Sequence, residues 1–323
     1  MTTTAHRLPG SGGPRHRRFV VGVDGSEHSR AALAWALVEA ARRGAALDVV
    51  TTFPLDFYWT DAYLLDSRHV DAIRDDTAAR ARAFLDEVRA TPEVAAAGPV
   101  KVTLVVLTGS PAEELVLRSQ DADLLVVGSR GRGAVRSTVL GSVALHCTVH
   151  ARCPVVVVRP GERRVENRVV VGLDDSVAGR AALAAAAEEA RHRGARLDAV
   201  VGVTPADGWT ELYVQSVPTL EAMCEDAVRF GRRLVDDVLG APGDLDVQVL
   251  ADVGPVDEVL AQHAQEAALL VVGSRSRSRI AGMVLGSVAL RSVVRAECPV
   301  MVVHPPRTAV PAEQPAAVAA GSG

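Results

Sequence analysis

Short apolar runs rich in valine and leucine alternate with longer segments of helical periodicity along most of the chain. Five runs in the first half are expected to be strands: 18–24, 46–53, 100–107, 124–128 and 153–158. Leu33, Leu37 and Ala41 share one face of the segment after the first run. Ser26 precedes this segment as an N-cap, and Gly44 follows it as a C-cap. This alternation predicts parallel βαβ units with right-handed crossovers.

The second half of the chain repeats the first element by element. Its expected strands are 168–174, 197–203, 245–250, 268–272 and 298–303. We therefore predict an α/β fold of two tandem doubly wound domains, each a parallel five-stranded sheet of order 3-2-1-4-5 with helices on both faces. The expected parts are a disordered tail over 1–17, domains over 18–160 and 168–304, a linker over 161–167 and a second disordered tail over 305–323.

Composition supports this architecture and narrows the classes of function. Hydrophobic residues make up 48% of the 323 residues and aromatic residues only 3%, as is typical of parallel strands covered by alanine-rich helices. A net charge of −4 favours no nucleic-acid partner. The sequence offers no apolar run of about 18 residues for a membrane span, and its start lacks the apolar core of a signal peptide. Four cysteines without a CxxC pair indicate buried thiols in a reducing cytoplasm: Cys147, Cys153, Cys224 and Cys298.

The most informative stretch follows the fourth expected strand. Gly128 ends the apolar run, Gly131 follows after two residues, and Gly141-Ser142 opens a helix after a further nine. A helix start presents free backbone N–H groups and the positive end of its dipole, and glycines let the backbone close around phosphate oxygens. The loop also carries three arginines: Arg130, Arg132 and Arg136. The stretch therefore predicts an anion site.

A doubly wound sheet binds ligands outside the carboxyl ends of its strands, where the strand order reverses. With the order 3-2-1-4-5, Asp24 and the glycine-rich loop flank that point. We expect Asp24 near a sugar, a base or a metal ion, and the loop around phosphates. The alternatives are a turn residue for Asp24 and a plain turn before a helix for the loop. Asp24 recurs as Asp174 in the second half, which favours the ligand interpretation.

These features resemble the universal stress protein family. They are the early aspartate, the Gly-x2-Gly-x9-Gly-Ser spacing, the Gly109-Ser110-Pro111 turn and the apolar ending at 153–157, and the likeness runs twice between residues 18 and 304. The spacing is that of the family's ATP-binding branch, so the resemblance implies ATP, with Mg²⁺. It implies contacts to ribose and adenine from Val23, Asp24, Gly25 and either Val50 or Thr51. It implies phosphate contacts from Gly128, Ser129, Arg130, Gly131, Gly141, Ser142 and Val143. The tandem arrangement resembles actinobacterial members, which are described as ATP-binding regulators of stress and dormancy.

The second copy of the loop departs from the pattern. Its matching residues are Asp174, Gly273, Arg275, Gly286 and Ser287. Ser276 stands in place of Gly131, and Ser278 in place of Gly133. If the loop requires a positive φ at Ser276, a non-glycine residue there costs on the order of 1–2 kcal/mol, about tenfold in affinity. Its remaining arginines keep the loop cationic. We expect the first site to bind nucleotide and the second to bind weakly or not at all.

The sequence contains no catalytic signature. Its one lysine, Lys101, follows Val100 rather than the glycine of a phosphate-binding Gly-Lys motif. His146 and His150 lie one helical turn apart, but no third metal ligand is evident, so no metal site is predicted. We predict an ATP-binding stress-response regulatory protein that is not an enzyme beyond weak hydrolysis. A slow ATPase and a nucleotide-free interaction module are the alternatives.

The last strand of each half bears on assembly. Residues 155–158 and 300–303 would form exposed apolar edges if each domain stood alone. Antiparallel pairing of the two strands across a pseudo-twofold axis removes both edges, and the resemblance implies the same, because family members dimerise through this strand. We expect an intrachain pseudo-dimer, a homodimer of chains and a protein partner that the sequence does not identify.

Overall fold

The computed structural model describes residues 17–53, 67–132, 140–204, 219–240, 243–275 and 285–305. The predicted disordered tails, apart from Arg17 and Pro305, lie outside these residues. So do Arg136 and the two serines, Ser276 and Ser278, that distinguish the second glycine-rich loop.

The described elements alternate as the sequence predicts. In the first half they are β1 (Arg18–Gly22), α1 (Glu27–Arg43), β2 (Ala46–Phe53), α2 (Ser67–Arg89), α3 (Pro92–Ala97), β3 (Val102–Thr108), α4 (Pro111–Arg118), β4 (Leu124–Gly128), α5 (Ser142–His150) and β5 (Val155–Val158). In the second half they are β6 (Glu166–Gly172), α6 (Val177–Arg193), β7 (Arg196–Val203), α7 (Leu220–Leu239), β8 (Val247–Val253), α8 (Val256–His263), β9 (Ala267–Gly273), α9 (Ser287–Arg295) and β10 (Val300–Val303).

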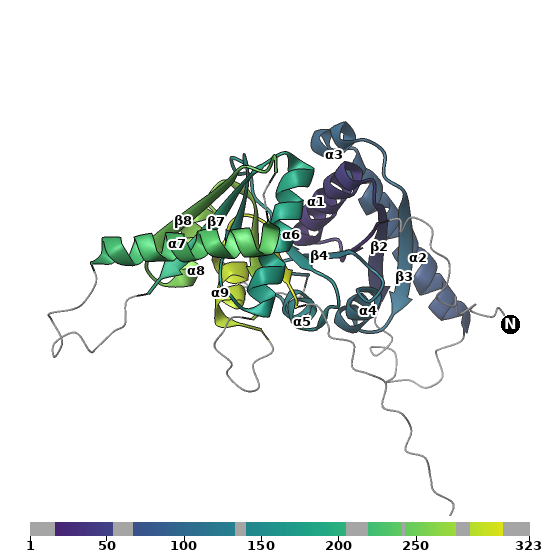
Figure 1. Ribbon diagram of the computed structural model, residues 1–323. Helices are drawn as coiled ribbons and strands as arrows, with labels where there is room; N and C mark the ends of the chain where they lie inside the picture. Colours follow the sequence, from purple (N-terminus) through teal and green to yellow (C-terminus); the bar gives the residue numbers. More distant parts are fainter. Residues whose placement is uncertain are drawn as a thin grey trace, which may run out of the picture.

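The strands form one continuous ten-stranded sheet of order β3-β2-β1-β4-β5-β10-β9-β6-β7-β8 (Figure 1). Each half is parallel and has the predicted order 3-2-1-4-5. The halves meet where β5 pairs antiparallel with β10, with Val156 opposite Met301. The predicted pairing of the two edge strands is therefore confirmed, and it merges the two expected sheets into one.

Local sequence explains where the helices begin and end. Ser26 caps α1 by accepting a hydrogen bond from the Ser29 N–H at 3.2 Å, and Gly44 ends the helix in the left-handed conformation with φ 60°. Both caps were predicted. The buried face of α1 contains Leu33 and Leu37 as expected, but its last fully buried residue is Ala40, whereas Ala41 is only partly buried.

Several bounds differ from the prediction by one to three residues; for example, β1 ends at Gly22 rather than at residue 24, and β8 spans Val247–Val253 rather than 245–250. The short helix α3 was not predicted; it begins with a proline, whose fixed φ suits the first helical position. Strand β6 begins at Glu166, inside the predicted linker. The Glu166 N–H donates to the Glu266 carbonyl at 2.7 Å, so the pairing of β6 with the start of β9 extends the strand toward its N-terminus.

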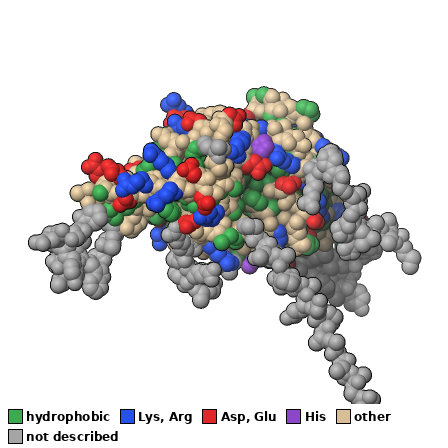
Figure 2. Space-filling model, viewed as in Figure 1, with side chains coloured by type: hydrophobic (Ala, Val, Ile, Leu, Met, Phe, Trp, Pro, Cys, Tyr) green, Lys and Arg blue, Asp and Glu red, His purple; other side chains and the backbone are tan. Residues whose placement is uncertain are grey.

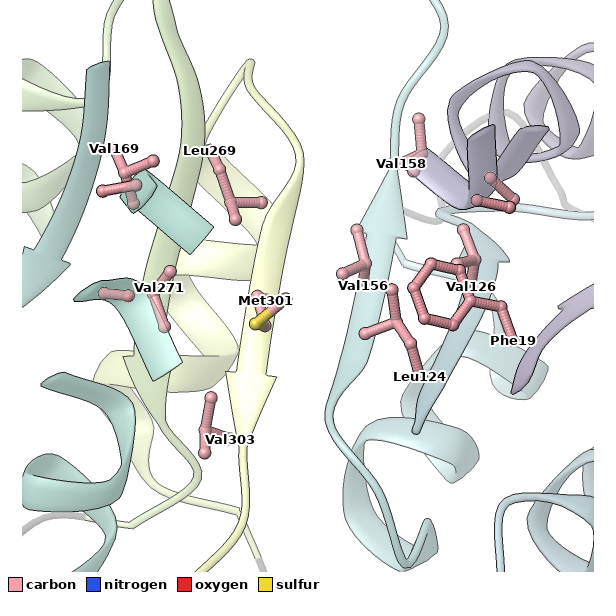
Figure 3. Close-up of a cluster of buried hydrophobic side chains, with 14 of the residues drawn as sticks. Phe19, Leu124, Val126, Val156, Val158, Val169, Leu269, Val271, Met301 and Val303 are labelled. Carbon is pink, nitrogen blue, oxygen red and sulfur yellow. The ribbon is translucent and has the colours of Figure 1, made fainter. Parts of the chain in front are cut away.

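The apolar core has two layers, one on each face of the sheet. In one layer Val156 and Val158 of β5 belong to the same buried cluster as Met301 and Val303 of β10, together with Phe19 and other strand residues (Figure 3). The cluster is therefore continuous across the junction of the halves. Burying each such side chain stabilises the fold by about 1.5–3 kcal/mol, so separating the halves would expose a large apolar surface.

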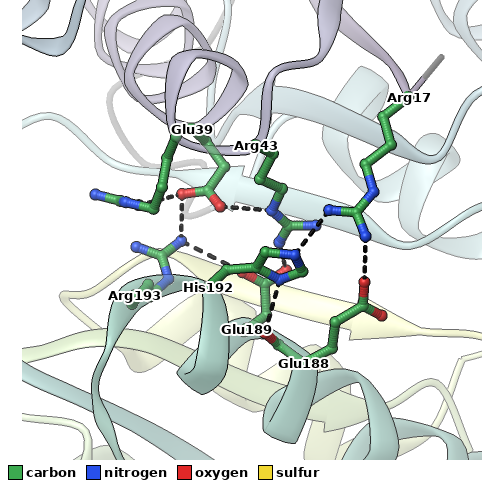
Figure 4. Close-up of polar contacts among 8 residues, drawn as sticks. Arg17, Glu39, Arg43, Glu188, Glu189, His192 and Arg193 are labelled. Carbon is green, nitrogen blue, oxygen red and sulfur yellow. Dashed lines mark hydrogen bonds and ion pairs between the residues drawn. The ribbon is translucent and has the colours of Figure 1, made fainter.

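A buried group of charges also joins the halves, where α1 lies against α6 (Figure 4). Glu39 accepts from Arg43 Nε and from Arg193 Nη2, both at 2.7 Å, and Arg43 also pairs with Glu189. Glu39 is fully buried and Glu189 is 3% exposed. Burial lowers the pKa of Arg193 to about 10. Each glutamate thus contacts an arginine of both halves.

The outer surface carries both signs of charge. On the face shown in Figure 2, acidic and basic side chains are interspersed, including those along α7. No described helix is long and apolar enough to cross a membrane.

Candidate functional site

A cavity of about 560 Å³ opens at the carboxyl ends of β1, β2 and β4 in the first half. Its wall combines strand ends, the turn before α4, the glycine-rich loop and the start of α5. The lining residues are Gly22, Val23, Asp24, Ser29, Val50, Thr52, Gly109, Pro111, Leu115, Val127, Gly128, Arg130, Gly131, Arg132, Gly141, Ser142, Val143 and Ala144. The sequence predicted a site at this point of the sheet, where the strand order reverses.

Asp24 joins the end of β1 to the glycine-rich loop. Its Oδ1 accepts a hydrogen bond from the Ser26 N–H at 2.9 Å, and its Oδ2 accepts one from the Arg132 N–H at 2.8 Å. Burial alone would raise the pKa of Asp24, but hydrogen bonds from Ser26, Arg132 and Ser29 outweigh it, and the pKa is lowered. The side chain is therefore an ionised carboxylate at neutral pH, with both oxygens already bound to the backbone.

The loop glycines are required by close contacts rather than by backbone angles. A Cβ at Gly128 would lie 2.6 Å from the His28 carbonyl carbon, and one at Gly131 would lie 2.8 Å from Asp24 Oδ2. A Cβ at Gly141 would lie 3.2 Å from the Arg130 Cα. None of the three has a positive φ, so the proposed φ requirement behind the argument on Ser276 is wrong for its counterpart Gly131. Ser276 itself lies outside the described residues.

The start of α5 supplies backbone hydrogen-bond donors to the cavity. Its N-cap, Gly141, has no side chain to satisfy the first N–H groups, whereas Ser26 caps α1. Ser142, Val143 and Ala144 form the first turn of α5 and line the cavity. Because the free N–H groups and the positive end of the dipole face the same space, this wall suits an anion.

Nine of the residues named for the first site line the cavity: Val23, Asp24, Val50, Gly128, Arg130, Gly131, Gly141, Ser142 and Val143. Gly25, Thr51 and Ser129 do not line it. Of the two alternatives on β2, Val50 lines the cavity and Thr51 does not, because side chains alternate along the strand. The Ser129 side chain is fully buried, and its Oγ lies 2.9 Å from His28 Nδ1.

Other lining residues were not predicted for the site. Thr52, Leu115 and Ser29 are among them, whereas Arg132 belongs to the loop that was predicted to bind an anion. The sequence holds one signal for Leu115, the glycine at the end of β1. A Cβ at Gly22 would lie 2.7 Å from Leu115 Cδ1, so only glycine leaves room for this leucine of α4. Gly109 of the Gly-Ser-Pro turn has a φ of 114°, a conformation that glycine adopts readily.

The second half repeats part of this geometry with different detail. Asp174 Oδ1 accepts the Ser176 N–H at 2.7 Å, as Asp24 does from Ser26. The Ser176 hydroxyl also donates to the Arg275 carbonyl at 3.2 Å. A Cβ at Gly202, the counterpart of Thr52, would lie 3.0 Å from Val256 Cγ2. Gly273, Gly286 and Ser287 hold the corresponding places at the end of β9 and the start of α9.

The remaining candidate groups do not extend the site. The rings of His146 and His150 lie 4.5 Å apart on α5. Among the described residues no group of three His, Cys, Asp or Glu side chains is placed to hold a metal ion. Burial raises the pKa of Cys147 and of Cys153 to about 12, and that of Cys298 to about 11. These thiols are inert at neutral pH.

Comparison with known proteins gives the family. Residues 15–159 and 166–304 each match the universal stress protein family. A universal stress protein of Mycobacterium tuberculosis is 32% identical over 294 residues, which cover 88% of this chain and 95% of the relative. One of Mycolicibacterium smegmatis is 31% identical over 295 residues, covering 89% and 97%. The crystal structure of a universal stress protein from Archaeoglobus fulgidus superposes with a TM-score of 0.62 at 23% identity, covering 89% and 96%, and so shares the fold. The chain belongs to the universal stress protein family.

Proposed function

We propose that this chain is an ATP-binding regulatory protein of the stress response, and that its nucleotide occupies the first-half cavity. The observation that carries the proposal is the meeting of Asp24, the glycine-rich loop and the uncapped start of α5 around one space. The loop spacing that resembles the ATP-binding branch of the family falls on this space. Four free cysteines support a reducing cytoplasm as the place where the protein acts.

The chemistry of the wall suits an adenine nucleotide. The volume of about 560 Å³ is within the range of small-molecule sites, roughly 300–1,000 Å³. Val50, Leu115 and Val127 supply apolar surface for a base. Arg130, Arg132 and the first N–H groups of α5 supply positive charge and donors for phosphates. Mg²⁺ bound with the nucleotide would neutralise phosphate charge, and Asp24 is the lining carboxylate that would face it, since each oxygen keeps a second lone pair.

We propose little or no hydrolysis. Asp24 is the one carboxylate among the described lining residues, and a general base for water must be free to accept a proton. Both Asp24 oxygens accept backbone N–H groups, and the lowered pKa makes the carboxylate a poor base.

In this proposal nucleotide occupancy changes the loop between β4 and α5, and thereby the binding of a protein partner or the formation of a homodimer.

Calorimetric titration with ATP and Mg²⁺ tests the proposal. We expect about one nucleotide per chain in the wild type, and loss of that binding in Asp24→Asn, because an amide cannot accept both N–H groups. The matched variant Asp174→Asn keeps it. At ATP concentrations 100-fold above Kd, binding to the folded state adds about 2.7 kcal/mol to the free energy of unfolding. No heat and no stabilisation would reject the proposal and favour the nucleotide-free module. Turnover in the wild type that Asp24→Ala abolishes would favour the ATPase.

A further inference from the structure

Arg159 and Arg130 leave neighbouring strand ends beside the first-half cavity. Strand β5 lies next to β4 with Val158 opposite Gly128. The Ser129 N–H donates to the Val158 carbonyl at 2.9 Å. Arg130 and Arg159 are the next residues of the two chain segments that this hydrogen bond joins. Arg130 lines the cavity, whereas Arg159 is not among its lining residues.

The other half of the chain holds Arg159 in place. Its Nη2 donates to the Val293 carbonyl at 2.9 Å and also to the Val294 carbonyl. Both carbonyls belong to the last turn of α9, where helix carbonyls have no intrahelical partner and the dipole favours a cation. Because the anchor belongs to the second half, the position of this guanidinium depends on how the halves pack.

Neither arginine has an acidic partner among the described residues. The Nε atoms of Arg130 and Arg159 are both buried without a hydrogen bond. Burial and then the charge of Arg130 lower the pKa of Arg159. Burial lowers the pKa of neighbouring His28 too, and the charge of Arg130 adds to that effect. Beside the glycine-rich loop there are thus two positive charges that form no ion pair with a carboxylate of the described residues; Asp24 lines the same cavity but accepts backbone N–H groups.

We infer that Arg159 is a positioning residue that sets the charge preference of the first-half cavity: with Arg130 it selects multiply charged phosphate over a singly charged phosphodiester. The inference rests on the proposed function and specifies its ligand. Two adjacent cations repel each other, and a ligand with two or more negative charges relieves that repulsion more than a singly charged ligand does. Nucleoside di- and triphosphates meet this requirement, whereas a cyclic mononucleotide does not.

The second half has the same connection with a histidine in place of the arginine. The Ser274 N–H donates to the Val303 carbonyl at 2.8 Å, and His304 takes the place of Arg159. Its Nε2 donates to the Thr148 carbonyl of α5 at 3.0 Å, so each half anchors the other. Burial lowers the pKa of His304, which leaves the imidazole neutral at pH 7. The second half therefore lacks the paired charge, independently of Ser276.

Binding of ATP, AMP, cyclic AMP and adenosine to the full chain without Mg²⁺ tests the inference. In Arg159→Met the preference for ATP over cyclic AMP falls about tenfold, as expected for one lost charge interaction near a protein surface, while adenosine binding is unchanged. Arg159→Lys keeps the charge and restores most of the preference. Arg163→Met is the control, because Arg163 also donates to a carbonyl of the second half, Ala267 at 2.6 Å, but does not adjoin Arg130.

The outcomes separate the two proposals. An unchanged ratio of ATP to cyclic AMP affinity in Arg159→Met overturns the inference and leaves nucleotide binding intact. An equal loss for adenosine and ATP also overturns it, because it would show that Arg159 only supports the fold. If the wild type binds none of the four compounds, the inference fails, because the two arginines then do not hold an uncomplexed nucleotide; the proposed function fails as well only if ATP with Mg²⁺ also shows no binding.

Discussion

The carboxylate of Asp24 accepts the backbone N–H of Arg132 at 2.8 Å, which fastens the glycine-rich loop to the end of β1. The same oxygen lies 2.8 Å from the position that a Cβ at Gly131 would occupy. One aspartate oxygen therefore both holds the loop and requires the glycine beside it. This contact explains why an aspartate and a glycine-rich loop far apart in the sequence occur together.

Replacing Gly131 tests that contact. Gly131→Ser introduces the residue that the second loop has at Ser276, and its Cβ displaces Asp24 Oδ2 from the Arg132 N–H. Loss of one charge-assisted hydrogen bond costs about 1.5–3 kcal/mol, so we expect ATP affinity to fall at least tenfold in calorimetric titration. Affinity within twofold of the wild type would show that the loop tolerates serine and that the second loop is not impaired for this reason.

The buried charges between α1 and α6 predict how the halves separate. Glu39→Gln removes a fully buried carboxylate that pairs with Arg43 and Arg193, and the arginines stay buried. Breaking one side of such a group costs about 3 kcal/mol, so the free energy of unfolding in urea should fall by about that amount. Glu188→Gln is the matched control, because Glu188 directly precedes Glu189 on α6 and also pairs with an arginine of the first half. Glu188 is 55% exposed and pairs with Arg17, so its loss should cost less than about 1 kcal/mol. Equal effects would contradict the assigned role of Glu39.

Two histidines predict a dependence of stability on pH. Burial lowers the pKa of His28 and of His304 below 6.5, so between the folded and unfolded values the unfolded chain binds more protons. Their contribution is fully present above pH 6.5 and is lost as the pH falls toward the folded pKa values. In urea unfolding, the free energy of unfolding should be lower at pH 5.5 than at pH 7.5. This difference should be smaller in the double variant His28→Gln and His304→Gln. His150→Gln, at an exposed position of α5, should leave the decrease unchanged. An identical decrease in the double variant would refute this assignment.

The thiols differ in reactivity. Cys147, Cys153 and Cys298 are buried, with pKa values raised to about 12, 12 and 11, whereas Cys224 of α7 is partly exposed. Because the thiolate is the reactive form, iodoacetamide at pH 8 should modify Cys224 alone in the folded protein and all four cysteines after unfolding. Mass spectrometry of the peptides locates the label. Early labelling of Cys147 would mean that α5 opens readily and that the start of this helix is not a rigid wall of the cavity.

The elements and the location of the site were predictable because their signals are local. The apolar run before Gly128, the glycines and the Gly-Ser helix start fixed β4, the loop and α5, whose bounds agree with the prediction. The apolar edges at 155–158 and 300–303 predicted the junction of the halves, because an unpaired edge of that kind is unfavourable.

Two kinds of feature were not predictable in the same way: which face of β2 lines the cavity, and which residues far apart in the sequence contact one another. Val50 and Thr51 were left as alternatives because β2 is buried on both faces, so its pattern does not show which side faces the cavity. The bond between Asp24 and Arg132 involves a backbone N–H, which leaves no mark in the sequence. Arg159 reaches α9 only because the halves pack together, and no spacing within either half records that contact.

The adenine nucleotide retained by the freshly purified chain tests the central claim most directly. Ser142 and Ser287 are the exposed first residues of α5 and α9, so a glutamate at either place suits the helix start and repels phosphate. We predict about one nucleotide per chain after denaturation and chromatography, lost in Ser142→Glu and kept in Ser287→Glu. No nucleotide in the wild type, together with no binding of added ATP and Mg²⁺, would contradict the account. Loss in Ser287→Glu alone would place the nucleotide in the second half.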